Sequence, residues 1–264
     1  MFRDRFDLVF SIGGNCACAM FLNETKLRMA SSPFDWLSSA PFEERIDTLC
    51  SRFRGFLVRE NIAWHSPGQG DRASDVYMDT VHGYRFVHDF PKNTPLDESF
   101  PRVRAKYDRR IARLLKRLDD GARACLVWWS LDMHPSDEAC RAGIERVREA
   151  FPNSDCKLIV FENDKSFGLG KTAEHPLSEH CLKIRGAIAP DGCSVLGDRD
   201  LNVGMYRRIR IGGRLAAERR RFVVLRALAR LLSLWHLDRE SRKRAREAWE
   251  ARLWRKGGAE SVGW

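Results

Sequence analysis

The sequence predicts an α/β protein with a doubly wound, mostly parallel sheet, helices on both faces of that sheet, and a basic helical extension at the C-terminus. Short apolar runs alternate with helix-like segments along the chain, which is the order produced when crossover helices join parallel strands. The apolar runs are bounded by glycine, proline and short polar clusters. The C-terminal segment differs from the rest in its charge.

Four elements are predicted in the first half of the chain. Gly13, Gly14 and Asn15 interrupt the first apolar run and mark a strand-to-helix turn. Gly121 is a suitable stop for the second helix. The elements are a strand over residues 7–12, a helix over 16–23, a strand over 84–88 and a helix over 100–118.

The second half continues the alternation. Its first strand is apolar on both faces, as expected for a central strand that helices cover on both sides. Ser136 is a candidate N-cap, and Asp137 and Glu138 suit the first turn of the helix that follows. The predicted elements are a strand over residues 124–131, a helix over 136–150 and strands over 157–162 and 181–188.

The composition is that of a globular protein. The chain has 264 residues, of which 44% are hydrophobic and 31% are charged, so a sizeable core can form. The N-terminus carries charges where a secretory signal needs an apolar run, and no stretch offers about 18 uncharged apolar residues. We expect a cytoplasmic protein that can also lie at the periphery of the inner membrane.

The charge is distributed in a way that predicts two regions, an α/β domain over residues 1–203 and a basic tail over 204–264. The tail holds 17 Lys and Arg against 6 Asp and Glu, whereas the rest holds 29 against 30. Nucleic acid is not favoured as a partner, because only an appendage is basic and no nucleic-acid motif accompanies it.

Within the tail, residues 221–237 predict a basic amphipathic helix. Its apolar stripe either packs on the core of the domain or docks on an anionic membrane surface or a protein partner. The stripe comprises Phe222, Leu225, Leu228, Ala229, Leu232 and Trp235.

The eight cysteines are scattered, and we expect reduced thiols rather than a disulfide scaffold. Cys16 and Cys18 form the only close pair. A metal site that combines Cys16 with His82 and His88 is not favoured, because no short cluster of Cys and His supports it. We therefore expect neither a metal nor an organic cofactor.

Ligands of open α/β sheets bind beyond the carboxyl ends of the strands, so the residues at those ends are the candidates for a site. Cys16 follows the first strand and begins a helix, where the helix dipole favours its thiolate. The other strands end at His88-Asp89, Asp132-Met133-His134 and Asn163-Asp164.

This pattern predicts a cysteine–histidine pair. His88 is the candidate general base and acid, and Asp89, Asp132 or Asn163 is the candidate group that holds its ring. The alternative is an ordinary strand-to-helix corner in which Cys16 is only a small residue.

Further residues are candidates for binding an oxyanion or a substrate. Amides from Gly13 to Cys16 can surround an oxyanion, with Ser11 and Asn15 beside them. In Pro33-Phe34-Asp35-Trp36, Asp35 and Trp36 either line a substrate pocket or anchor a loop and cap the next helix. Arg109 and Arg110 either bind an acidic group or form a solvated helix face.

The same residues carry a resemblance to a known family. The runs are Asp7 to Ala19, Leu27-Arg28, Ser32 to Leu37, Phe86 to Phe90 and Tyr107 to Ile111. In order and spacing they resemble a bacterial family of uncharacterised proteins described as putative papain-like cysteine peptidases, over roughly residues 5–165 of this chain.

The resemblance implies that Cys16 is the nucleophile and His88 the base. Two features depart from papain-like enzymes. Those enzymes have a glutamine shortly before the cysteine, whereas the only glutamine here is Gln69, and their histidine lies in a mostly antiparallel sheet.

The leading hypothesis is therefore a cysteine-dependent acyl-transfer enzyme, a peptidase, amidase or acyltransferase, that acts on a small-molecule or peptide-like substrate. The alternative is a non-catalytic module that binds a small molecule or carbohydrate at the same strand edge and is tethered through the basic tail. A Gly-Asp-Ser-type ester hydrolase is disfavoured, because the Asp79-to-His82 pair comes too early in the chain.

Overall fold

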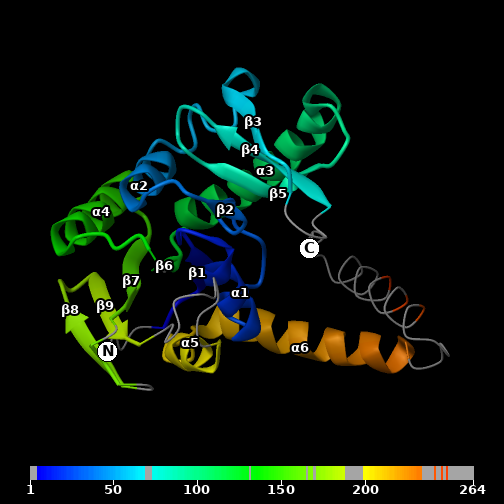
Figure 1. Cartoon of the computed structure of the whole chain (residues 1–264). Coiled ribbons are helices and arrows are strands. Elements are labelled where there is room, and N and C mark those ends of the chain that lie inside the picture. Colours follow the sequence, from blue (N-terminus) through cyan, green and yellow to red (C-terminus); the bar gives the residue numbers. More distant parts are fainter. Residues whose placement is uncertain are drawn as a thin grey trace.

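The computed structural model describes residues 5–68, 73–130, 132–164, 166–168, 171–187 and 199–233, and the single positions 241, 245 and 248. It is a mixed α/β structure with two sheets (Figure 1). The larger sheet has five strands, in the spatial order β1 (Leu8–Ser11), β6 (Arg123–Ser130), β7 (Asp155–Asn163), β9 (Cys181–Gly186) and β8 (Thr172–Pro176).

The described helices lie around this sheet and its smaller neighbour. The predicted helices at residues 16–23, 100–118 and 136–150 are confirmed, whereas the helix at residues 42–50 was not predicted. The helices are α1 (Cys16–Glu24), α2 (Phe42–Cys50), the short 3-10 turn η1 (Arg59–Asn61), α3 (Leu96–Asp119), α4 (Asp137–Ala150), α5 (Arg199–Tyr206) and α6 (Gly213–Ser233).

Four strands of the larger sheet are parallel, and β8 pairs with β9 in the antiparallel sense. Among the four described parallel strands the chain order runs in one direction across the sheet, β1, β6, β7 and β9, and only the antiparallel β8 departs from it by lying at the edge beyond β9. The switch point expected of a doubly wound sheet is therefore not found among them. The physical reason is that α3 and α4, which precede β6 and β7, cover the same face, so both right-handed crossovers advance the sheet in one direction.

Helices nevertheless cover both faces of the larger sheet. Alternate residues of a strand point to opposite faces, and β6 shows this directly. Leu126 and Trp128 pack in the core beside α3 and α4, whereas Val127 and Trp129 pack in a second core beside α1 and α5. β6 is thus a central strand covered on both sides, as its sequence predicts.

The smaller sheet is antiparallel and is inserted between α1 and α3. The predicted strand at residues 84–88 is confirmed, but it belongs to this sheet and not to the parallel one, because its neighbours pair with it in the antiparallel sense. Its order is β2 (Leu37–Ser38), β5 (Arg85–Pro91), β4 (Ser74–Asp79) and β3 (Ile62–Ser66).

Two predicted helix ends are confirmed in detail. The Ser136 hydroxyl accepts a hydrogen bond from Ala139 N–H at 3.1 Å and caps α4. Gly121 follows α3 with a φ of 82°, the left-handed conformation that favours glycine after a helix.

Residues on both sides of the predicted boundary between 203 and 204 share a core. Met205, Tyr206, Ile209 and Leu215 are buried in the core that also contains α1, so core contacts cross that boundary. The predicted helical tail is therefore not supported as a separate unit, and residues 234–240 and almost all later ones lie outside the described part of the chain.

The long helix α6 runs away from the sheets (Figure 1). Its predicted stripe does not pack on the core throughout, because the Leu228 and Leu232 side chains are exposed. Among the helices in the described part of the chain, none has the length and apolar character that would let it cross a membrane.

A buried lysine joins α4 to the larger sheet. Lys183 of β9 is 2% exposed and contacts Asp137 at 2.6 Å, Glu162 at 3.0 Å and the Pro135 carbonyl at 3.2 Å. Burial lowers the pKa of Lys183, but its hydrogen bonds to the two carboxylates raise that pKa above the usual value overall. The hydrogen bond from Lys183 lowers the pKa of Asp137.

We predict that Lys183→Met lowers the free energy of unfolding by about 2–4 kcal/mol at pH 7, because it removes the buried ammonium that Asp137 and Glu162 share and leaves them only the longer contacts to His175 and Arg185. The depressed pKa of Asp137 means that this stabilisation is present above about pH 4 and is lost as the pH falls through the folded value. The raised pKa of Lys183 means that it is also lost at high pH, above about 10.4.

Urea unfolding of the parent and the variant at pH 7, 5 and 3 measures the effect. Lys171→Met, at an exposed position, is the matched control and should change stability by no more than about 0.5 kcal/mol. An equal loss for Lys183→Met at pH 7 and pH 3 would contradict the role of the carboxylates.

Candidate functional site

The turn between β1 and α1 is closed by its own hydrogen bonds. Gly13 N–H donates to the Ser11 hydroxyl at 3.1 Å, and Gly14 N–H donates to the Trp129 carbonyl at 3.1 Å. Ser11 is fully buried. These two amides and Ser11 therefore serve the turn itself, contrary to the expectation that they face an oxyanion or a substrate.

Both glycines are required by close packing. A Cβ atom on Gly13 would lie 2.9 Å from the Trp129 carbonyl oxygen. A Cβ atom on Gly14 would lie 3.0 Å from the Ser130 hydroxyl and would overlap Met133. The turn thus lies directly against the carboxyl end of β6.

The two neighbouring cysteines have different environments. Cys16 is the first residue of α1 and is partly exposed, and the Asn15 side chain caps the helix by accepting from Ala17 N–H at 3.0 Å. Cys18 is fully buried and its thiol contacts the Val127 carbonyl at 3.4 Å. Burial raises the pKa of Cys18 to about 11, so only Cys16 of this pair has the placement of a reactive thiol.

A buried arginine on α2 holds the turn in place. The Arg45 side chain is fully buried and donates to the carbonyls of Gly14 at 3.4 Å, Leu37 at 3.1 Å and Ala40 at 3.1 Å. Desolvation by burial lowers the pKa of Arg45 to about 10, which leaves it charged at neutral pH. The guanidinium therefore connects the turn before Cys16 to β2 of the smaller sheet.

Sequence reasoning missed Arg45. A signal was present, because Arg45 falls on the helix face that also carries Phe42, Ile46 and Leu49. A charged residue within an apolar stripe indicates a buried cation with specific partners. The aromatic rings around it lie 5.4–6.0 Å from its guanidinium carbon and belong to Phe34, Tyr84 and Trp128.

His88 is exposed on β5, in the smaller sheet. It was expected at the carboxyl edge of the parallel sheet, and that placement is wrong because β5 pairs only with β2 and β4. Its ring lies edge-on to Trp36, with centroids 5.5 Å apart at 76°. Trp36 directly precedes Leu37. Arg45 donates to the carbonyls of both Leu37 and Gly14. It therefore connects the segment beside His88 to the turn that precedes Cys16.

Asp89 does not share the surroundings of His88. Its carboxylate is buried and accepts from the Tyr107 hydroxyl at 2.9 Å and from Lys106. Neighbouring residues of a strand face opposite sides. Asp89 therefore ties β5 to α3, and we assign it a structural role in place of the expected role of holding the His88 ring.

The other candidate partners lie along the parallel sheet. Asn163 ends β7, two strands from β1, which corresponds to about 10 Å. Asp132 is exposed and accepts from the Ser130 hydroxyl at 2.9 Å. Because Ser130 packs on Gly14, Asp132 lies beside the cysteine turn.

Asp35 is a structural residue. It is fully buried, forms an ion pair with Arg28 and accepts from Ser32 N–H at 2.8 Å. Desolvation by burial raises its pKa despite these partners. The substrate-binding interpretation of Asp35 is therefore not supported, whereas Trp36 remains half-buried beside His88, with Arg28 over its ring at 5.7 Å.

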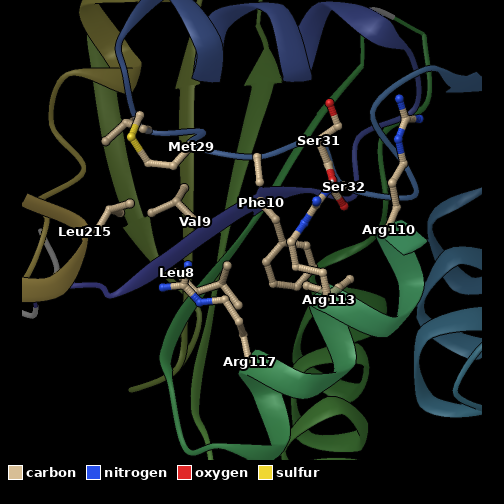
Figure 2. Close-up of a pocket in the computed structure, with 13 residues that line it drawn as sticks. Leu8, Val9, Phe10, Met29, Ser31, Ser32, Arg110, Arg113, Arg117 and Leu215 are labelled. Carbon is tan, nitrogen blue, oxygen red and sulfur yellow. Dashed lines mark hydrogen bonds between the residues drawn. The ribbon is translucent and has the colours of Figure 1, made fainter. Parts of the chain in front are cut away.

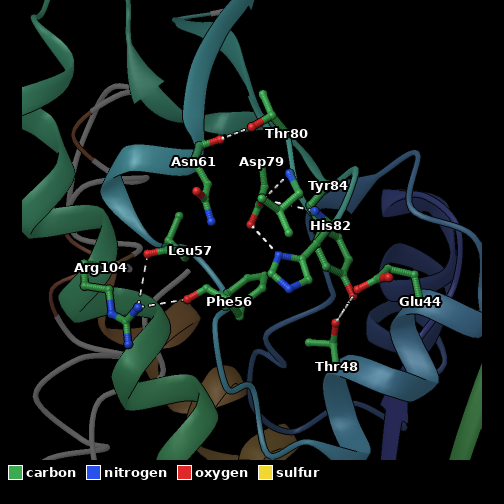
Figure 3. Close-up of polar contacts among 11 residues, drawn as sticks. Glu44, Thr48, Phe56, Leu57, Asn61, Asp79, Thr80, His82, Tyr84 and Arg104 are labelled. Carbon is green, nitrogen blue, oxygen red and sulfur yellow. Dashed lines mark hydrogen bonds and ion pairs between the residues drawn. The ribbon is translucent and has the colours of Figure 1, made fainter.

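An aspartate–histidine pair, Asp79 with His82, lies at the turn between β4 and β5 (Figure 3). Asp79 is buried and accepts from the backbone amides of Val81 and His82, and it lies 3.1 Å from His82 Nδ1. These contacts close the hairpin. Among the residues that the structure describes, no group of three His, Cys, Asp or Glu side chains is arranged to hold a metal ion.

We predict that Arg45→Lys lowers the free energy of unfolding by about 2–4 kcal/mol, because a lysine lacks the planar fork and leaves buried carbonyls without a donor. Urea unfolding measures the loss. Arg54→Lys, at an exposed position four residues after the end of α2, is the matched control and should change stability by no more than about 0.5 kcal/mol. Equal stabilities of the two variants would show that Arg45 is not a structural clamp.

The comparisons with known proteins bear on the same region. Neither the curated proteins nor the solved structures contain a match to this chain. Residues 7–128 match the model of a family described as "Putative papain-like cysteine peptidase (DUF1796)". The match covers just under half of the chain, includes both Cys16 and His88, and makes this part of the protein similar to that family.

Proposed function

We propose that the protein is a cysteine-dependent acyl-transfer enzyme in which Cys16 is the nucleophile and His88 the general base and acid. The observation that carries this proposal is the placement of Cys16. It begins α1, is partly exposed, and lies within the segment similar to the peptidase family. A thiol at a helix N-terminus is favoured as the thiolate by the helix dipole.

The proposed reaction has two half-reactions. His88 accepts the thiol proton, and the Cys16 sulfur attacks the substrate carbonyl to form a tetrahedral intermediate. The intermediate collapses to a thioester while His88 donates the proton to the leaving group. Water or a second nucleophile then attacks the thioester, gives its proton to His88 and releases the acyl product, after which the proton returns to the thiolate.

Oxyanion stabilisation in this proposal comes from the N-terminal end of α1. The Gly13 and Gly14 amides already donate within the protein, so the helix dipole and the backbone at Asn15 take over the role first expected of the glycines. Nothing in this chemistry requires a metal or an organic cofactor.

Trp36 is proposed as the residue that positions His88, because its ring lies edge-on to the imidazole. Asn163 and Asp132 are the remaining candidates for a polar group that holds the ring. The substrate is a small-molecule or peptide-like amide or ester, and the acceptor, water or another nucleophile, decides between hydrolysis and transfer.

The pH dependence of Cys16 alkylation by iodoacetamide, followed by mass spectrometry of its peptide, tests the pair. In the parent protein we expect the alkylation rate to reach half its maximum well below about pH 8.5, the value of a free thiol. In His88→Ala the midpoint should rise by about one pH unit or more, because an imidazolium stabilises the thiolate.

Two controls accompany this measurement. His65→Ala removes another exposed histidine of the same sheet and should leave the midpoint unchanged. Cys18 should stay unmodified in the folded protein, because it is buried and its pKa is raised to about 11. A midpoint near 8.5 that ignores His88 would overturn the enzyme proposal and favour the ligand-binding module.

A second prediction separates catalysis from mere reactivity. An activated ester such as p-nitrophenyl acetate should transfer its acetyl group to Cys16, and the parent should then release acetate. His88→Ala should accumulate the acetylated protein, because water lacks its general base. Intact-mass measurement during the reaction follows both steps, and equal deacylation of parent and variant would exclude His88 from the second half-reaction.

A further inference from the structure

A pocket lies at the open edge of β1 (Figure 2), and neither Cys16 nor His88 is among the residues that line it. β1 is the edge strand of the larger sheet, and residues 8–10 form the floor of the pocket. Helix α3, the loop over residues 27–32 and Leu215 of α6 surround that floor. Its open space, including solvent at the mouth, is about 430 Å³.

Most of the wall is apolar. Leu8, Val9 and Phe10 line the floor, and Met29 and Leu215 close one side (Figure 2). Such a wall favours an apolar ligand body over water, because burying apolar surface is favourable.

One side of the pocket carries three cations of α3. Arg110, Arg113 and Arg117 lie three and four residues apart and therefore share a helix face. Arg117 donates to the Asp7 carbonyl at 2.6 Å and lies 3.3 Å from Glu218. Arg113 donates to the Ser31 carbonyl at 2.7 Å, so two of the three arginines have protein acceptors.

Arg110 differs from its two neighbours in having no described hydrogen bond to a protein acceptor, although Arg117 also has a buried Nε without a partner. Arg110 is 7% exposed, and its Nη1 atom is buried without a hydrogen-bond partner. The Ser32 hydroxyl, which also lines the pocket, is buried and likewise lacks a partner. These two buried donors, one on α3 and one in the loop over residues 27–32, are unfavourable when unsatisfied, and an acceptor in the pocket would remove that cost.

The protein's own charges do not complete this site. Asp35 is the buried carboxylate whose charge acts on both Arg28 and Arg110. Its Oδ2 atom accepts from Arg28 and from Ser32 N–H, whereas its Oδ1 atom is buried without a hydrogen-bond partner, so no hydrogen bond joins Asp35 to Arg110. Two buried arginines therefore share one carboxylate. An anion in the pocket would supply the missing negative charge.

We propose that this pocket binds a small organic anion, an acidic group attached to an apolar chain. The acidic group accepts from Arg110 Nη1 and the Ser32 hydroxyl, and the chain lies along Leu8, Val9 and Phe10. Charge-assisted hydrogen bonds fix the head, and the apolar floor selects against inorganic anions. The proposal goes beyond the acyl-transfer activity, because none of these residues takes part in the Cys16–His88 pair.

Isothermal titration calorimetry with octanoate, octyl phosphate, octanol and inorganic phosphate tests the site. We expect octanoate or octyl phosphate to bind saturably, and the stronger of the two identifies the acidic group as a carboxylate or a phosphate ester. Octanol and inorganic phosphate should bind at least about tenfold more weakly, since each lacks one half of the recognition. Binding of octanol as tight as that of octanoate would overturn the proposal.

Substitutions then locate the ligand. Arg110→Met should weaken binding about tenfold or more. Arg109→Met, which removes the same charge from the adjacent exposed position, should leave affinity unchanged. Ala30→Phe should abolish binding by filling the partly exposed mouth of the pocket. Unchanged affinity in both Arg110→Met and Ala30→Phe would place any binding elsewhere.

Two further variants separate a loss of binding from a loss of folding, and this site from the proposed catalytic site. Ser32→Ala should weaken binding a few-fold even if Arg110→Met does not fold, and circular dichroism checks the fold of each variant. Cys16→Ala should bind octanoate as the parent does, so that failure of the acyl-transfer proposal does not count against this site. Loss of binding in Cys16→Ala would show that the two sites are one.

Discussion

A buried guanidinium, that of Arg45, is the interaction on which the arrangement of the two sheets depends. It donates to carbonyls on the cysteine turn, on β2 and on the segment that leads into α2. Aromatic rings surround it, so carbonyl oxygens and π-systems take the place of a carboxylate, and only its Nη1 atom is left without a hydrogen-bond partner. Such a cation has no equally good alternative set of partners, and it therefore fixes which backbone segments meet.

The candidate site follows from that constraint. The parallel sheet supplies the turn and the helix that present Cys16, whereas the antiparallel sheet supplies His88 and the ring of Trp36. The proposed site would combine groups from two sheets and would need a rigid connection, because catalytic groups must be held to within a fraction of an ångström. Two ion pairs of buried carboxylates, Arg28 with Asp35 and Lys106 with Asp89, fix the loop that carries Trp36 and the strand that carries His88.

The sequence was sufficient to predict the parallel core, the helix that begins at Cys16 and the cap at Ser136, because apolar runs and local caps are encoded within each segment. It was not sufficient for the smaller sheet. β3 exposes Ala63, Trp64 and His65 in succession, so it lacks the alternation that marks a strand. The surroundings of Asp89 were missed because its partners, Lys106 and Tyr107, come from another helix that no local pattern connects to it. Asp35 was missed for a different reason: its partners, Arg28 and Ser32, are nearby in the chain but lie in a loop with no helical or strand period.

Tyr206 packs beneath α1, where its ring stacks on Phe161 at 4.4 Å and its hydroxyl donates to the Cys18 sulfur at 3.4 Å. Both aromatic residues come after residue 128, where the similarity to the peptidase family ends. The helix that presents Cys16 therefore packs on side chains from the other half of the chain. β6 would also lose its pairing with β7 if the chain stopped there. The segment that carries the family likeness is thus not a self-sufficient module, and its exchange between proteins would require a compatible C-terminal half to travel with it.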